Sequence, residues 1–173
     1  MRRSWMAAVA ALCLMPLPAF AQAAKPNDAQ IAHIAYTAGA LDVAAGKQAL
    51  AKSKNKEVRA FAEQMVKDHT AVNKKALALV KKLKVKPQDN PTSQALTKQA
   101  KAKHDELAKL KGAAFDKAYV ANEIAYHKTV NNALQAQLIP SASNPELKSL
   151  LETGLKIFEG HEQHAEHVGA DLK

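Results

Sequence analysis

Apolar residues recur every three or four positions along four long segments of this chain, which is the spacing of one face of an α-helix. Alanine, leucine, lysine and glutamine dominate these segments, and no stretch after residue 25 alternates as a strand does. The expected helices cover residues 27–53, 57–84, 113–138 and 146–172. The chain is therefore predicted to be all-α, with four apolar faces packed together in a four-helix bundle.

Breaks in the pattern separate these helices. Asn55 is expected to cap the second helix, and the loops 85–91 and 140–145 each contain two prolines. Residues 92–110 form a shorter, very polar segment that ends before Gly112. We expect this segment to be an additional helix that crosses from the first antiparallel pair of helices to the second.

The start of the chain combines a basic segment, an apolar run over residues 6–17 and the small residues Ala19 and Ala21. This pattern is typical of a secretory signal peptide, and the apolar run is shorter than the roughly 20 residues that span a bilayer. We expect a signal peptide over residues 1–21 and a single domain over residues 22–173. The expected location is the periplasm.

Positive charge dominates the chain, with 25 Lys and Arg against 16 Asp and Glu. Outside the cytoplasm, such a charge favours anionic envelope polymers as partners. No nucleic-acid partner is expected, since aromatic residues are only 5% of the chain and single-strand binding needs stacking rings. The lone cysteine, Cys13, lies in the expected signal peptide, so the remaining chain has no disulfide and no thiolate ligand.

Polar side chains interrupt each of the four apolar stripes near the middle of its helix. They are Asp42, His69, Glu123 with His127, and His161. In a bundle of helices of similar length the midpoints lie at one depth, so these side chains are expected to converge in the core. Imidazole and carboxylate groups bind transition metals such as zinc and copper.

Two further residues share helix faces with the central histidines. Met65 precedes His69 by four positions and His164 follows His161 by three, so each pair could bind one ion together. The alternative is a hydrogen-bonded histidine network without metal, because an unsatisfied buried group costs about 1–3 kcal/mol. The remaining histidines lie off the stripes and are expected at the surface: His33, His104 and His167.

A faint internal repeat relates the second long helix to the third. Residues 61–69 align without gaps on residues 119–127, with aromatic, apolar and histidine positions matched. Two halves related in this way are predicted to place His69 and His127 face to face.

Four blocks of the sequence are similar to one family of exported bacterial proteins. These blocks are Asp28-Ala29-Gln30, Phe61…Asp68-His69, Gly112…Phe115-Asp116…Tyr119…His127 and Pro145-Glu146-Leu147…His161. They resemble domain of unknown function family 4142 (DUF4142) over about residues 27–170. The resemblance implies a ferritin-like bundle and an association with the outer membrane. This sequence has Glu123 and His164 where the family often has methionine, which shifts the donors towards oxygen and nitrogen.

The leading hypothesis is a periplasmic, ferritin-like bundle that binds copper or zinc for storage, buffering or stress protection. Its ligands would be His69, His127 and His161, with Glu123 and Asp42 completing the site or orienting the histidines. The first alternative is a metal-free envelope protein that contacts anionic polymers. The second is an iron redox enzyme, which is disfavoured because paired Glu-x-x-His motifs are absent. No phosphate loop or nucleophile elbow is found, so no catalytic residue is assigned.

Overall fold

Helices account for nearly all of residues 25–172, which are the residues that the computed structural model describes. The helices are α1 (Asp28–Lys52), α2 (Lys56–Lys82), α3 (Pro91–Ala108), α4 (Gly112–Ala133), α5 (Ile139–Ser141) and α6 (Pro145–Asp171), with a π-helical turn, η1 (Leu134–Leu138), after α4. No strand occurs in this part of the chain. The predicted all-α bundle is confirmed. The expected signal peptide, with Cys13, lies outside the described residues.

An asparagine side chain caps the start of each of four helices. Asn27, Asn55, Asn90 and Asn144 each accept a hydrogen bond from a backbone N–H in the first turn of the helix that follows. Such a cap is worth about 1 kcal/mol relative to alanine. Asn55 was predicted as a cap, whereas Asn90 and Asn144 stand next to prolines in segments expected to be loops.

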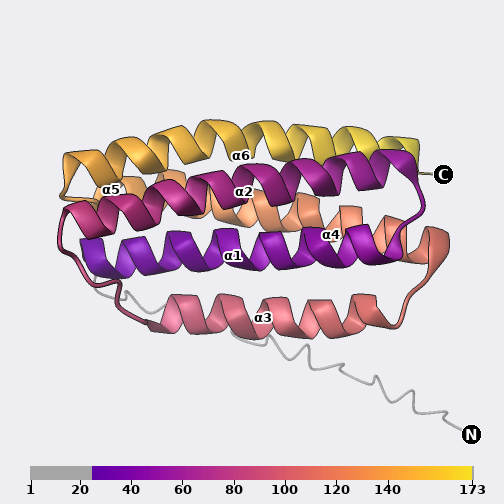
Figure 1. Ribbon diagram of the computed structural model, residues 1–173, viewed down its shortest axis with the longest axis horizontal. Coiled ribbons are helices and arrows are strands. Elements are labelled where there is room, and N and C mark those ends of the chain that lie inside the picture. The colour runs from indigo at the N-terminus through magenta and orange to yellow at the C-terminus, as the bar shows by residue number, and fades with distance from the viewer. Residues whose placement is uncertain (1–24, 173) are drawn as a thin grey trace, which may run out of the picture.

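The four bundle helices, α1, α2, α4 and α6, follow an up-down-down-up order (Figure 1). The pair α1 and α2 is antiparallel, and so is the pair α4 and α6. Between them α3 runs back along the outside of α1, so that α2 and α4 begin at the same end of the bundle (Figure 1). One long crossover between two antiparallel pairs is the connectivity of ferritin-like bundles.

Two apolar clusters form the core of the bundle, one near each end. The first contains Phe61, Met65 and Val120, and the second contains Ile34 and Phe158. On every long helix, the polar residue that interrupts the stripe stands between residues of one cluster and residues of the other. The bundle therefore has a polar layer at mid-depth, as predicted from the helix midpoints.

The crossing helix α3 is the most polar element, and only Ser93 and Leu107 of its residues are buried. Side chains of α1 hold it in place, since Gln48 and Lys52 donate to main-chain carbonyls near its end, at 2.9 and 2.7 Å. His33 also contacts it, with Nδ1 2.8 Å from the Ser93 hydroxyl. His33 was expected at the surface and is instead half-buried, while the predictions for His104 and His167 are confirmed because both are exposed.

The chain does not leave the helix at Pro140, where the sequence predicted a loop. Helical backbone continues through η1 into α5, and the N–H of Ile139 reaches back to the carbonyl of Leu134. Proline has no N–H to donate and its ring crowds the carbonyl four residues before it. The wider π turn accommodates this proline without ending the helix. Among residues 25–172, no helix is long and apolar enough to cross a membrane.

Candidate metal centre

Five ionisable side chains meet in the polar layer. Asp42 on α1, His69 on α2, Glu123 and His127 on α4 and His161 on α6 are each exposed by 3% or less. Ionisable groups are seldom fully buried unless they are paired or bind a metal. The layer is therefore a candidate site rather than an ordinary piece of core.

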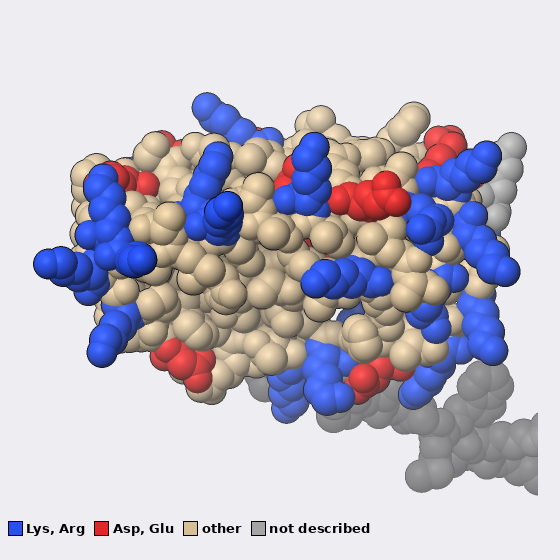
Figure 2. All heavy atoms as spheres, in the orientation of Figure 1, with Lys and Arg blue, Asp and Glu red and all other residues tan. Residues whose placement is uncertain are grey.

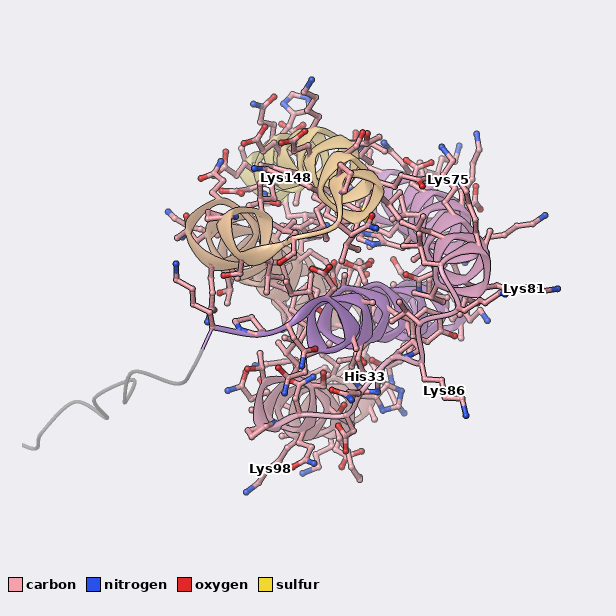
Figure 3. The ribbon with its side chains drawn as sticks, turned by 90° about the vertical axis from the view of Figure 1, so that its left-hand side faces the viewer. His33, Lys75, Lys81, Lys86, Lys98 and Lys148 are labelled. Carbon is pink, nitrogen blue, oxygen red and sulfur yellow. The ribbon has the colours of Figure 1, made fainter. Side chains whose placement is uncertain are left out.

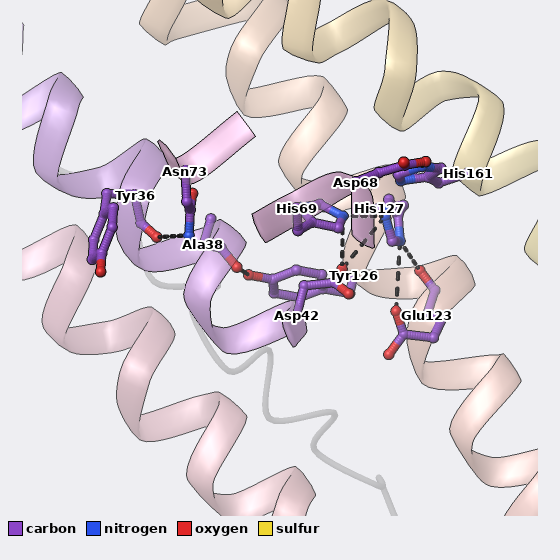
Figure 4. A network of polar contacts seen from close by, with 10 residues as sticks. All are labelled: Tyr36, Ala38, Asp42, Asp68, His69, Asn73, Glu123, Tyr126, His127 and His161. Carbon is purple, nitrogen blue, oxygen red and sulfur yellow. Dashed lines mark hydrogen bonds and ion pairs between the residues drawn. The ribbon is translucent and has the colours of Figure 1, made fainter. Parts of the chain in front are cut away.

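Three donor atoms form a nearly equilateral triangle at the centre of the layer (Figure 4). The Nε2 atoms of His69 and His127 are 3.4 Å apart, and Oδ2 of Asp42 lies 3.3 Å from the first and 3.5 Å from the second. Tetrahedral ligands at 2.0–2.1 Å from a zinc ion are about 3.3–3.4 Å from one another. The triangle thus has the dimensions of three ligands around one ion.

The backbone sets the tautomer of His127. Its Nδ1 lies 3.0 Å from the main-chain carbonyl of Glu123, one turn earlier on α4. Because a carbonyl oxygen can only accept, Nδ1 carries the proton and Nε2 presents a bare lone pair to the triangle. The proton between His69 and His127 is then on Nε2 of His69, and a cation bound in the triangle would displace it.

His161 is oriented by Asp68, a residue that the sequence analysis did not select. Its Nε2 lies 3.1 Å from Oδ2 of Asp68, and its Nδ1 is buried with no protein partner. One nitrogen of His161 is within 4.8 Å of nitrogens of both His69 and His127. A carboxylate behind a histidine is a common support for metal ligands, because it fixes the ring and makes it more basic.

Three of the four carboxylate oxygens in the layer accept no hydrogen bond. Neither oxygen of Asp42 accepts a hydrogen bond, and Oε2 of Glu123 accepts none. Burial raises the pKa of Asp42 to about 7 and raises that of Glu123 well above its ordinary value. Asp42, Glu123 and His127 also form a second group whose donor atoms lie within 4.8 Å of one another. A bound cation would interact with these oxygens. Without one, their burial without a hydrogen-bond partner destabilises the fold.

The histidines of the layer are neutral at physiological pH. Burial lowers the pKa of His69 to about 2 and that of His127 to about 4, with further lowering from the neighbouring imidazoles. Burial also lowers the pKa of His161, although Asp68 opposes this shift. Neutral imidazole is the form that binds metal ions.

The other two predicted ligands lie away from the triangle. Met65 is fully buried in the first apolar cluster, one turn before His69. His164 is half-buried, with Nδ1 2.9 Å from Oε1 of Gln64 and its ring edge-on to Phe61. The structure therefore brings together five of the seven predicted residues and adds Asp68.

Close approach of α1 and α2 sets the position of Asp42. A Cβ on Gly46, one turn after Asp42, would lie 2.9 Å from the Val66 side chain and 3.1 Å from the Ala62 carbonyl. Only glycine allows the two backbones to come this near without displacement. On the other side of α1, the Tyr126 hydroxyl of α4 donates to the Ala38 carbonyl at 2.9 Å (Figure 4).

A cavity of about 390 Å³ leads to the carboxylate side of the layer. Asp42, Glu123 and Tyr126 line its inner part, and α3 forms its outer wall with residues such as Lys101 and His104. On the opposite side, the ring of Phe158 stacks on His69 with 4.5 Å between centroids. An ion would therefore reach the centre from beneath α3, while apolar residues shield its other side.

Comparison with known protein families identifies a family for this chain. Residues 15–168 match the family described as Domain of unknown function (DUF4142), and this range includes every residue of the polar layer. No curated protein and no solved structure matches the chain.

Proposed function

The chain belongs to the DUF4142 family, and we propose that it is an exported protein that binds one transition-metal ion in the core of its bundle. The triangle formed by Asp42, His69 and His127 carries this proposal, because its edges of 3.3–3.5 Å match the spacing of ligands around one ion. His161 and Glu123 are the candidates for the remaining positions. Resemblance of the sequence to exported proteins supports a periplasmic location.

Zinc and copper(II) fit the donors best. The layer offers imidazole nitrogens and carboxylate oxygens, whereas copper(I) prefers sulfur ligands. A di-iron site of the ferritin-like enzymes needs glutamates from all four helices. Asp42 and Glu123 are the two carboxylates that the described residues place in the layer, so iron redox chemistry is not proposed.

Storage or buffering of the ion fits the surroundings better than catalysis. When bound, the ion would supply Lewis acidity, but the layer is shielded by Phe158 on one side and by apolar clusters at both ends. The side chains of this chain would hold the ion, and they would release a proton when it binds. We place the protein among metal-buffering or stress-protection functions of the envelope.

Metal analysis of the untagged protein, purified from the periplasm, tests this proposal. We expect close to one zinc or copper ion per chain, and calorimetric titration of the metal-free protein should give the same stoichiometry. His69→Ala should abolish binding of the ion, whereas His104→Ala should leave it unchanged because His104 is exposed on α3. Equal metal content in the two variants would refute the site.

A second role rests on the surface charge. Lysine and arginine side chains outnumber acidic ones on the face shown in Figure 2 and are spread over it rather than gathered in a cleft. Such a surface would contact anionic envelope polymers without a built pocket, so that the contact weakens as salt screens the charges over about 8 Å. Lipopolysaccharide binding that persists in high salt would contradict this role.

A further inference from the structure

A second cavity, of about 640 Å³, occupies the half of the bundle that contains α5. Residues of α1, α2, α3, α4, η1 and α6 line it, and it opens to solvent where the lining residues Thr92, Gln99 and Gln137 are exposed. Its volume lies within the roughly 300–1,000 Å³ of small-molecule sites. Protein interiors are usually packed without voids larger than a water molecule, so a space of this size requires an explanation.

Small side chains create the space. Where the second apolar cluster would need large residues to close the bundle, the walls carry alanines and a glycine: Ala32, Ala35, Ala38, Ala76, Ala95, Ala133 and Gly154. The larger lining residues, such as Leu134, Leu151 and Phe158, are aliphatic or aromatic. Apolar walls offer water few hydrogen bonds, so replacement of that water by an apolar molecule is favourable.

The π-helical turn forms part of the same wall. Leu134, Gln137 and Leu138 of η1 all line the cavity. Single π turns inside α-helices occur frequently at functional sites. The backbone irregularity and the void therefore coincide, although each is a separate observation.

No charged side chain lines the cavity among the residues that the structure describes. Its polar lining groups are amides and hydroxyls: Asn73, Thr92, Gln99, Thr129 and Gln137. The lysines at this end of the bundle, such as Lys81, Lys86 and Lys98, point away from the interior (Figure 3). A ligand that carries a charge would lose its hydration here without gaining an ion pair.

We propose that this cavity binds one neutral, mainly hydrocarbon molecule, such as a long-chain alcohol. The chain of the ligand lies against the aliphatic walls, and its polar end meets the amide and hydroxyl side chains. Phe158 lines this cavity and also stacks on His69, so the bound molecule lies one side chain away from the candidate metal centre. The proposal does not rest on metal binding and is tested on metal-free protein.

The test is a fluorescence titration with N-phenyl-1-naphthylamine, a neutral apolar probe. We expect saturable binding of one probe per chain and displacement by 1-dodecanol. Dodecanoate at pH 8 should displace the probe at least tenfold less well, because no cationic group lines the cavity. Displacement by dodecanoate as good as that by the alcohol would overturn the assignment of a neutral ligand.

Variants that fill the cavity locate the site. Ala133→Phe on α4 and Ala35→Phe on α1 place a ring in the space from different helices and should each reduce probe affinity at least tenfold. Ala121→Phe is the matched control, because Ala121 is exposed on α4 and does not line the cavity. Circular dichroism checks that each variant is folded. Unchanged affinity in both filled variants would overturn the site.

A series of alcohols tests the unmodified protein independently. Binding in a cavity of limited volume should strengthen with chain length and then stop increasing when the space is full. Binding to a surface should continue to strengthen with every added carbon, and that result would refute the cavity as the site.

Discussion

The Nε2 atoms of His69 and His127 lie 3.4 Å apart, although the two residues come from helices that are diagonal to each other in the bundle. Helix α1 packs against both α2 and α4, and α6 packs against the same two helices. Contact across the diagonal means that both side chains reach the axis of the bundle. An ion bound there would be held by opposite sides of the core at once.

Loss of His127 should remove the stabilisation that metal provides. An ion at a hundredfold excess over its Kd stabilises the folded chain by about 2.7 kcal/mol, or a rise in Tm of roughly 5–10 °C for a domain of this size. Thermal melts with and without zinc or copper(II) should show this rise in the unmodified protein and little of it in His127→Ala. His104→Ala should behave as the unmodified protein. Equal melts with and without metal in the unmodified protein would end the metal proposal for those ions.

Asp42→Asn should separate metal affinity from stability. The substitution keeps the shape of the side chain and removes a buried carboxylate that accepts no hydrogen bond. We expect the metal-free variant to be at least as stable as the unmodified protein, since desolvation of the charge is relieved. Metal affinity should fall by more than about tenfold, because even groups behind the ligands contribute about 10–100-fold. Unchanged affinity in calorimetric titration would exclude Asp42 as a ligand.

Acid should destabilise the metal-free form of Asp42→Asn more steeply than that of the unmodified protein. The pKa of His127 is lowered to about 4, so between pH 6.5 and 4 the unfolded chain binds a proton that the folded chain does not, and stability falls as the pH falls. The pKa of Asp42 is raised to about 7, so between pH 7 and 4 its protonation opposes that loss.

Removing Asp42 removes this opposing contribution, which is worth up to about 1.4 kcal/mol per pH unit. Urea unfolding of both proteins between pH 7 and 4.5 measures the difference in slope. Parallel pH profiles would show that Asp42 ionises in the folded chain much as it does in the unfolded chain.

Gly46→Ala should weaken both the fold and the centre. The added methyl group meets the Val66 side chain and the Ala62 carbonyl, so α1 must move away from α2. Overpacking of this kind costs about 1–3 kcal/mol, and the movement displaces Asp42 from His69. Gly160→Ala is the control, since nothing lies within 4 Å of the added atom, and it should stabilise α6 by about 0.5–1 kcal/mol. A stable Gly46→Ala variant with full metal affinity would contradict this account of helix approach.

Processing at the expected signal peptide is directly measurable. Ala19 and Ala21 stand at the positions that signal peptidase reads, with Ala23 as an alternative end. N-terminal sequencing of the envelope fraction should begin at Gln22 or at Ala24. An intact Met1 in that fraction would count against export by this route.

Much of the centre could be predicted because it depends on helix periodicity. The positions of Asp42, His69 and His161 on their stripes were enough to predict a common depth. The internal repeat predicted that His69 and His127 face each other, and their Nε2 atoms are 3.4 Å apart. The matched residues Phe61 and Tyr119 also pack edge to face, with 6.2 Å between ring centroids. Both predictions use only the spacing of residues within each helix, which can be read directly from the sequence.

Features that depend on how helices rotate against each other could not be predicted. Asp68 is next to the stripe residue His69 on α2, but its hydrogen bond with His161 depends on the angle between α2 and α6. His164 is one turn from His161, yet it turns towards Gln64 instead of the centre. Pro140 indicated a loop because local chemistry disfavours a helix there, whereas a π turn accommodated it.

The polar layer also has a consequence for the alignment of the helices that holds with or without an ion. Each long helix has ionisable residues at mid-depth and apolar residues above and below. A slip of any helix by one turn, about 5.4 Å, would move an imidazole or carboxylate into an apolar cluster and a hydrocarbon side chain into the layer. Alternative axial alignments of the helices are therefore disfavoured. Single buried polar residues fix the register of coiled coils in the same way. The residues proposed to hold the metal would thus also fix the axial register of four otherwise similar helices.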